Sequence, residues 1–440
     1  MSGSSPWDHV PLDSVAETAL GKMLDRGKTR GLAPVPYLRN VNVQWGRIDT
    51  DDVLAMEISA DERERFGLRA GDLLVCEGGE IGRAAIWTGT TTYMAYQKAL
   101  HRVRPGSHLD VRFLRYFLQH AAQAGALNAL ATGSTIRHLP QQQLRRLGVP
   151  LPTIQEQRRI VDILEDHLSR LDVADLEVDT ARRRLAILDD AVALRTLLPV
   201  AMGPRAAEVS ISNGVLPELP EGWEWKTLGD VAAVVGGVTK DSKKQSDPGL
   251  AEVPYLRVAN VQRGFLDLGH VALIRVSPAK RDQLRLLRGD VLLNEGGDRD
   301  KLARGWVWDA ELDVCIHQNH VFRARPDTTL VNPYWLSWCA NTYGSLWAQR
   351  HGKQSVNLAT ISLSMVRKLP IAIPPLDTQS TLLSELNESL DARDRLRRTL
   401  DASRQRSASL RRTLLAAAFS GKLTGAASDS DRIEELATRT

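Results

Sequence analysis

The chain contains the same pattern twice: Val35-Pro36-Tyr37-Leu38-Arg39 with Asn42-Val43-Gln44, and, about 220 residues later, Val253-Pro254-Tyr255-Leu256-Arg257 with Asn260-Val261-Gln262. Ten of the fifteen positions in 35–49 are identical in 253–267. A period this long is not a solenoid repeat, so it indicates a duplicated domain. We therefore predict a pseudo-dimer within one polypeptide, with two similar sites related by an approximate twofold axis. Duplex DNA, which itself offers two half-sites, suits such a molecule.

Composition is that of an ordinary soluble globular protein, with 440 residues, 43% hydrophobic and 25% charged. No run of eighteen apolar residues and no secretory signal occur, so we expect a cytoplasmic protein without membrane contact. Cys76, Cys315 and Cys339 stand alone without metal-ligand spacing, and we expect no metal and no cofactor. A net charge of +4 permits nucleic-acid binding without indicating it.

The order of segments predicts an α+β fold in which two strand-rich modules alternate with two long helices. Short apolar runs such as 73–75 and 291–293 read as strands, and helices are expected near 111–118 and 333–338. The expected order is a first module (1–152), a central helix (153–200), a linker (201–220), a second module (221–375), a C-terminal helix (376–422) and a flexible tail (423–440).

The first helical segment has a seven-residue apolar repeat and the second has a similar but interrupted one, which predicts an antiparallel coiled coil between them. About 45 residues at about 1.5 Å each would form a spacer of about 65 Å. The alternative is that the helices only stabilise or dimerise the protein. The expected packing residues are Leu164, Leu171, Val178, Leu185 and Val192 in the first helix, and Leu382, Leu386, Leu396, Leu400, Leu410 and Leu414 in the second.

Four stretches carry a family likeness: Leu-Pro-x-Ile-Gln-Glu-Gln at 151–157, Leu-Pro-Glu-Gly-Trp-Glu-Trp at 219–225, Ile-Pro-Pro-Leu-Asp-Thr-Gln at 373–379 and Leu-Leu-Ala-Ala-Ala-Phe-Ser-Gly-Lys-Leu at 414–423. In this order, over nearly the whole chain, they resemble the specificity subunit of type I restriction–modification enzymes. The resemblance implies a non-catalytic subunit with two target recognition domains, each reading half of a bipartite, asymmetric site in double-stranded DNA. It also implies that the helices set the gap and help to dock two modification (methyltransferase) subunits, which restriction (endonuclease and translocase) subunits join.

One departure concerns the helices. From Thr153 to Arg195 there are 42 residues, and from the matching Pro375 to Arg412 there are 37, so the first helix is expected to be five residues longer.

Candidate DNA contacts fall into three groups. Paired donors and acceptors suited to base edges occur in both repeats at Asn42, Gln44, Asn260 and Gln262, although identical residues in both copies can equally hold the fold. Segments where the copies diverge are better candidates for reading different half-sites: Gln97 and Lys98 against Gln318, Asn319 and His320, and Ser134, Thr135, Arg137 and His138 against Lys353, Gln354, Ser355 and Asn357. Basic clusters suited to phosphate contacts are Lys22, Lys28 and Arg30, and Lys240, Lys243 and Lys244.

Catalytic motifs are incomplete. Residues 21–29 miss the spacing of a phosphate-binding loop by one residue, and Asn332-Pro333-Tyr334 lacks the second proline of an amino-methyltransferase motif. Glu77-Gly78-Gly79 and Glu295-Gly296-Gly297 read as tight turns. Two other functions stay open: a self-sufficient DNA methyltransferase or nuclease with an unrecognised site, and a coiled-coil protein for assembly.

Overall fold

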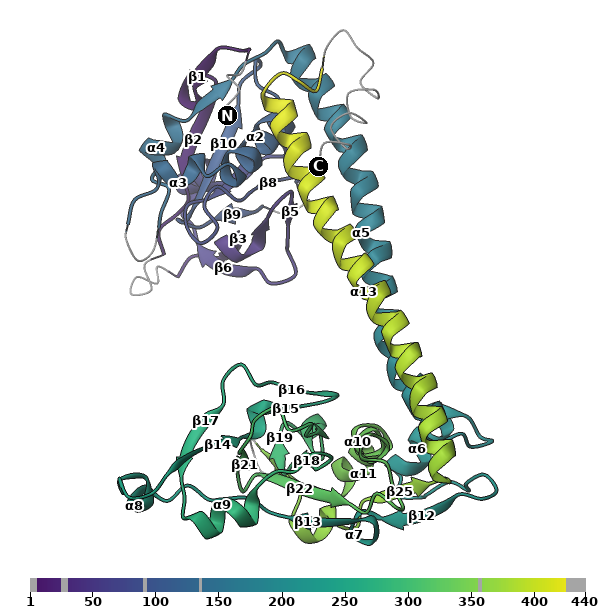
Figure 1. The fold of residues 1–440 in the computed structure, drawn as a ribbon. Helices are drawn as coiled ribbons and strands as arrows, with labels where there is room; N and C mark the ends of the chain where they lie inside the picture. Colours follow the sequence, from purple (N-terminus) through teal and green to yellow (C-terminus); the bar gives the residue numbers. More distant parts are fainter. Residues whose placement is uncertain (1–5, 25–30, 90–92, 134–136, 355–357, 425–440) are drawn as a thin grey trace. The chain divides into compact units, whose positions relative to one another are not determined.

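The structure is a computed structural model that describes residues 6–24, 31–89, 93–133, 137–354 and 358–424 (Figure 1). The chain forms two compact units, residues 1–179 with 400–440, and residues 180–399. Each unit holds one module together with the adjoining parts of both long helices.

The first module is built on an antiparallel sheet of order β2-β10-β7-β8, with bounds Ala16–Leu20, Leu100–Pro105, Leu73–Cys76 and Ala84–Ile86. All four residues of β7 are buried because both faces of the sheet are covered. Leu73 and Val75 pack in a cluster with α2 (Val111–Gln123), whereas Leu74 and Cys76 pack in a separate cluster with Tyr96. The alternation of side chains along a strand thus supplies two cores.

The second face is covered by a small sheet of order β6-β3-β9, with bounds Leu54–Glu57, Pro34–Leu38 and Ala95–Tyr96. The first copy of the repeated motif, residues 35–49, forms β3, a 3-10 turn and the hairpin β4–β5 (Val43–Gln44, Arg47–Ile48). The remaining elements of the module are β1 (His9–Pro11) paired with β11 (Gly148–Pro150), and the helices α1 (Ala60–Phe66), α3 (Ala126–Leu130) and α4 (Gln141–Arg145).

The second module repeats every one of these sheets. Its large sheet has the order β13-β22-β18-β20 (Ala232–Val235, Val321–Pro326, Val291–Asn294, Gly305–Val307), and its small sheet has the order β17-β14-β21 (Ala272–Arg275, Glu252–Leu256, Ile316–His317). The hairpin is β15–β16 (Val261–Gln262, Phe265–Leu266), and β12 (Glu224–Thr227) pairs with β25 (Pro370–Ile373). The duplicated sequence is therefore a duplicated fold, as predicted.

The second module also has elements that its counterpart lacks. Gly297 and Arg304 stand seven positions apart where the matching Gly79 and Arg83 stand four apart, and the 3-10 turn Arg299–Lys301 lies in this longer segment. A three-stranded sheet of order β19-β24-β23 (Gly296–Gly297, Ala359–Thr360, Lys353–Gln354) takes the place of two isolated bridges in the first module.

The helices of the second module are α7 (Leu228–Val231), α8 (Ser242–Gln245), α9 (Pro278–Leu284), α10 (Pro333–Asn341), α11 (Tyr343–His351) and α12 (Leu363–Val366).

The expected linker at 201–220 contains a helix, α6 (Pro204–Ser212). Ala207 and Ile211 of this helix are fully buried in the core of the second module. Glycine before the helix and proline at its first position account for its start, and burial of one apolar face accounts for its stability.

The two long helices are α5 (Ile154–Leu197) and α13 (Leu376–Phe419), and both contain 44 residues. The expected five-residue excess of the first helix is wrong, because Arg195 and Arg412 do not occupy equivalent positions relative to the ends of their helices. Figure 1 shows the two helices side by side. The start of α5 packs on the end of α13 (Leu164 with Leu415), and the end of α5 packs on the start of α13 (Leu197 with Leu386), so the pair is antiparallel as predicted.

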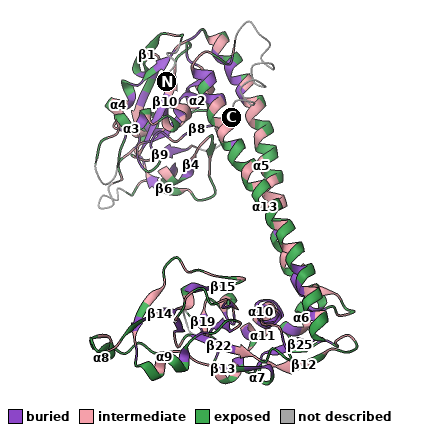
Figure 2. Ribbon diagram, viewed as in Figure 1, coloured by how far each residue is buried: buried purple, intermediate pink, exposed green. Residues whose placement is uncertain are grey.

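The predicted packing positions are buried or half-buried with one exception. Leu164, Leu185, Leu386 and Leu414 are buried, and Leu171, Val178, Val192, Leu382, Leu400 and Leu410 are half-buried. Leu396 is 47% exposed, so its assignment was wrong. Arg393 and Arg397 point to the partner helix instead and pair with Asp189. Figure 2 shows burial concentrated within the sheets of each module and sparse along the middle of the helices.

A buried glutamine fastens each long helix to its own module. The Gln157 side chain accepts a hydrogen bond from Asp110 N (2.8 Å) and donates to His108 O and Pro152 O (both 2.9 Å). Gln379 makes the same three bonds, to Asn332 N, Leu330 O and Pro374 O. Both glutamines are fully buried, which explains why the Gln of each family stretch stands where the helix begins.

Candidate functional site

The first module has a surface hollow of about 420 Å³ in which several predicted residues come together. Its lining includes Gln97, Lys98 and His138, which the sequence predicts as DNA contacts, and it also includes Glu77 and Asn40. The remaining lining residues are Met23, Leu24, Gly78, Gly79 and Ala99. The hollow therefore combines an amide, an ammonium, an imidazole and a carboxylate, which are the groups that hydrogen-bond to base edges.

Backbone pairing holds the wall of this hollow in place. Lys22 and Gln97 form a parallel bridge, and Gly78 and His138 form an antiparallel bridge. Gly21 is required next to the first bridge, because a Cβ there would lie 2.4 Å from the carbonyl group of Gln97. Ala99 has a φ of 98°, a backbone conformation that favours glycine, so the rim of the hollow stores strain.

The second module builds the same wall with other side chains. Val238 and Gln318 form the matching parallel bridge, and Gly296 pairs with Thr360 as Gly78 pairs with His138. Asn319 thus stands where the first module has Lys98, and His320 stands where it has Ala99. His320 Nδ1 lies 2.6 Å from Glu295 Oε2, whereas Glu77, the matching carboxylate, lines the open hollow.

The residues shared by the two repeats hold the fold. Asn42 is buried; its carbonyl oxygen accepts from Arg39 N, and its amide donates to the backbone oxygens of Asp49 and Asp52. Asn260 does the same with Arg257, Asp267 and His270. Gln44 and Gln262 donate to Val41 O and Ala259 O in their own turns. This geometry favours the second of the two interpretations, in which identical residues form the scaffold.

The basic candidates differ in availability. Lys22 Nζ lies 2.5 Å from Glu62 Oε1, and this hydrogen bond is the main reason that the pKa of Glu62 falls to about 2. Lys240, Lys243 and Lys244 are exposed on and beside α8. Arg137, Lys353 and Gln354 are exposed as well. Lys28, Arg30, Ser134, Thr135, Ser355 and Asn357 lie outside the described residues.

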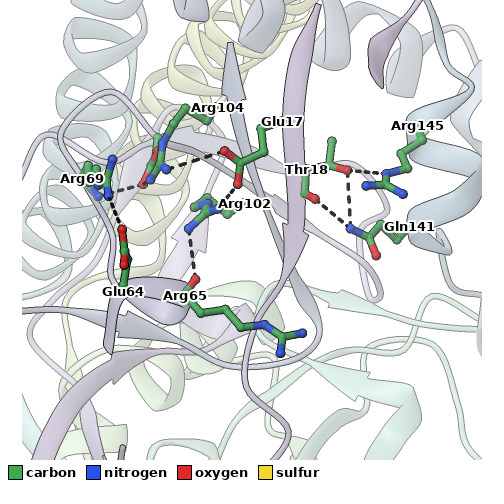
Figure 3. A network of polar contacts seen from close by, with 10 residues as sticks. Glu17, Thr18, Glu64, Arg65, Arg69, Arg102, Arg104, Gln141 and Arg145 are labelled. Carbon is green, nitrogen blue, oxygen red and sulfur yellow. Dashed lines mark hydrogen bonds and ion pairs between the residues drawn. The ribbon is translucent and has the colours of Figure 1, made fainter. Parts of the chain in front are cut away.

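A network of arginines and carboxylates lies on the large sheet of the first module (Figure 3). Asp72, 1% exposed, accepts from Arg104 through two parallel contacts of 2.7 and 2.9 Å, and Arg102 reaches Glu17 at 2.5 Å. The second module repeats the bidentate pair with Asp290 and Arg325, at 2.7 and 2.8 Å. Figure 3 also shows Gln141 and Arg145 of α4 donating to Thr18. The duplicated Gly-Asp and Arg-Pro pairs of the sequence are thus one structural device.

The described residues offer little for catalysis. Burial raises the pKa of Cys76 to about 11 and those of Cys315 and Cys339 to about 12, so these thiols stay protonated at neutral pH. Among the residues that the structure describes, no cluster of three histidine, cysteine or carboxylate side chains could hold a metal ion. Within the same residues, no helix is long and apolar enough to cross a bilayer.

Sequence reasoning missed part of the hollow. Asn40 donates to Gly78 O at 2.9 Å, and its own side-chain oxygen is buried without a hydrogen-bond partner. Met23 is 64% exposed at the rim. The second copy has Val258 where the first has Asn40, and Thr239 where the first has Met23. A comparison of the two copies at every position near the motif would have found Asn40.

The chain matches the family model described as the type I restriction modification DNA specificity domain, over residues 4–174 and 220–400. It is 21% identical to the StySPI specificity subunit of Salmonella potsdam, covering 89% of this chain and 82% of that protein. It is 22% identical to the EcoBI specificity subunit of Escherichia coli, covering 95% and 86%.

Solved structures agree on the fold. A chain from a structure described as the basis of complex assembly and conformational transition of the type I R-M system has a TM-score of 0.72, with 18% identity, 95% of this chain covered and 98% of that chain. The HsdS subunit from Thermoanaerobacter tengcongensis has a TM-score of 0.56, with 17% identity and coverage of 96% and 98%.

The protein therefore belongs to the family of type I restriction–modification specificity subunits. Its two modules are the two copies of the family's recognition domain, one in each matched segment. Proteins of this family are the DNA-recognition subunits of type I systems and not their catalytic subunits.

Proposed function

We propose that this chain reads a bipartite, asymmetric DNA site, with one half-site bound by each module. The observation that carries this proposal is the matched wall around the hollow, where the backbone pairing is the same and the side chains differ. Lysine bonds to guanine O6 and N7, whereas asparagine bonds to adenine N6 and N7. We therefore assign Lys98 a guanine in the first half-site and Asn319 an adenine in the second.

The two long helices would act as a spacer between the half-sites. Removing one heptad from α5 and one from α13 would shorten the antiparallel pair by about 10 Å, or roughly three base-pair steps. The gap in the recognised site should shorten accordingly. An unchanged gap would show that the helices do not measure the distance.

Docking of two modification subunits is proposed for the helices, with restriction subunits joining the assembly in the cytoplasm. Apolar side chains left exposed on them support this docking. They are Val173, Leu176, Ile187 and Leu188 on α5, and Leu376 and Leu396 on α13, with exposures of 60, 63, 72, 49, 39 and 47%. Isolated exposed leucines are common, but six such side chains along two helices are consistent with contact surfaces.

The test is to map methylated bases across a host genome with the parent chain and with Lys98→Asn and Asn319→Lys, each supplied with its own modification subunits. Lys98→Asn should relax or change one base of the first half-site only, with a discrimination loss of about 1–3 kcal/mol. Asn319→Lys is the matched exchange and should change only the second half-site. Unaltered sites in both variants would reject these residue assignments, and methylation without this chain would reject the function.

A further inference from the structure

The contact between the two long helices has a polar middle held by ion pairs from both units. Several ion pairs between the described parts of the helices join an aspartate of α5 to an arginine of α13. In the first unit, Arg411 lies 2.8 Å from both Asp172 and Asp175. Arg404 lies 3.2 Å from Asp175 and 3.5 Å from Asp179.

The second unit follows the same rule independently. Asp189 of α5 pairs with Arg397, and its Oδ1 lies 3.6 Å from Arg393 Nε. The side chains of Asp189 and Arg393 are only 18% and 17% exposed. Asp190 of the same helix instead binds Arg263 of the β15–β16 hairpin at 2.8 Å.

Several of these ion pairs involve side chains that are largely shielded from solvent. Asp175 is 18% exposed; burial pushes its pKa up, but the hydrogen bond from Arg411 and the nearby charges of Arg404 and Arg411 lower its pKa below the usual value. Ser407 is buried at the same contact. Exposed pairs contribute little, but charges held in a partly buried contact between helices select the partner, because a like charge opposite them is strongly unfavourable.

We infer that this seam admits only α5 against α13 and rejects α5 against α5 or α13 against α13. A homotypic pair would leave the aspartates of these ion pairs, or their arginines, without the opposite charges that they meet here. The kind of partner that fits α5 is thus an arginine-bearing antiparallel helix, found in its own chain. This rule keeps two different modules together in one asymmetric pair, and it stands whether or not the assignment of DNA bases is correct.

The test uses two full-length charge variants. R393D/R397D/R404D/R411D makes both sides of the seam acidic, and D172R/D175R/D179R/D189R makes both sides basic. Each alone should melt about 5 °C or more below the parent and should not self-associate. Mixed in equal amounts, they should form a two-chain complex by exchanging helices, seen by light scattering as twice the mass of one chain.

Two further proteins keep the test decisive if a variant folds poorly. The chain with all eight inversions restores opposite charges and should regain the melting temperature of the parent as a single chain. R395D/R398D/R406D/R412D inverts four exposed arginines of α13 and should behave like the parent. The inference fails if either seam variant pairs with itself, if R393D/R397D/R404D/R411D melts like the parent, or if the chain with all eight inversions does not recover.

Discussion

The two modules share the pairing of their sheets and a buried ion pair, whereas the side chains on the wall of the hollow differ. The same bidentate ion pair occurs at matching positions of both modules, between Asp72 and Arg104 and between Asp290 and Arg325. The wall of the hollow, in contrast, has Lys98 and Ala99 in one copy where the other has Asn319 and His320. After duplication, the sheet-forming contacts stayed the same while the polar rim diverged, which separates the residues that specify the fold from those available to specify a ligand.

The largest expected effect tests the shared interior. Asp72→Ala and Asp290→Ala should each destabilise their own module by about 3–5 kcal/mol, because each leaves a half-buried guanidinium without its bidentate partner. Chemical denaturation, followed separately for each module by hydrogen exchange, would measure the loss. Glu64→Ala, which removes an exposed pair with Arg69, is the control and should cost less than about 0.5 kcal/mol. A loss of stability in Glu64→Ala as large as that in Asp72→Ala and Asp290→Ala would show that burial of the aspartate is not what matters.

A second prediction uses a buried position at which the modules differ. His317 stands where the first module has Tyr96, and burial lowers its pKa from 6.5 to about 4. The folded module therefore keeps a neutral imidazole while the unfolded chain takes up a proton below pH 6.5. Stability from this group is complete above pH 6.5 and falls as the pH drops toward 4, by about 3 kcal/mol.

His317→Tyr should flatten that pH dependence in the second module. Unfolding measured between pH 7 and pH 4 would show it, with His320→Ala as a control at an exposed histidine. A variant that keeps the steep acid loss of the parent would show that His317 is not its source.

The smallest expected effect concerns the Lys22–Glu62 pair, which has no counterpart at Val238. Since the pKa of Glu62 is lowered to about 2, its contribution is complete above pH 4.5 and is lost as the pH falls through 2. Glu62→Gln should lower the stability of the first module by less than about 1 kcal/mol at pH 7, and the difference should narrow below pH 4.5. Asp61→Asn on the same helix is the control. An effect that persists undiminished at low pH would mean that the amide disturbs packing instead.

Local pattern was enough to predict much of this architecture. The repeat placed β3 and β14 in register, and the heptads predicted two antiparallel helices. Leu396 was assigned wrongly because a heptad count treats every leucine alike. The partner helix has Asp189 near this position, and Asp189 pairs with Arg393 and Arg397, so charged side chains and not Leu396 face the partner helix. The helix α6 was missed because its nine residues bury only one narrow face.

The hollow could be predicted only in part. Gln97, Lys98 and His138 were found through divergence between the copies, but Asn40 and Met23 come from other segments, and only the folded chain brings them together. The ion pairs between α5 and α13 join residues more than 200 positions apart, for example Asp175 and Arg411. Neither propensity nor spacing carries such information.

The glutamines at the start of the long helices have a practical consequence for building new recognition domains. Because Gln157 bonds to the loop before α2, and Gln379 to the loop before α10, the first turn of each helix is part of the interior of its module. A transplanted module cut at Leu151 or Ile373 would leave this amide behind and carry unpaired backbone groups. The natural boundary for exchange lies one helical turn later, beyond Gln157 and Gln379, so that the donor glutamine travels with the loop it bonds.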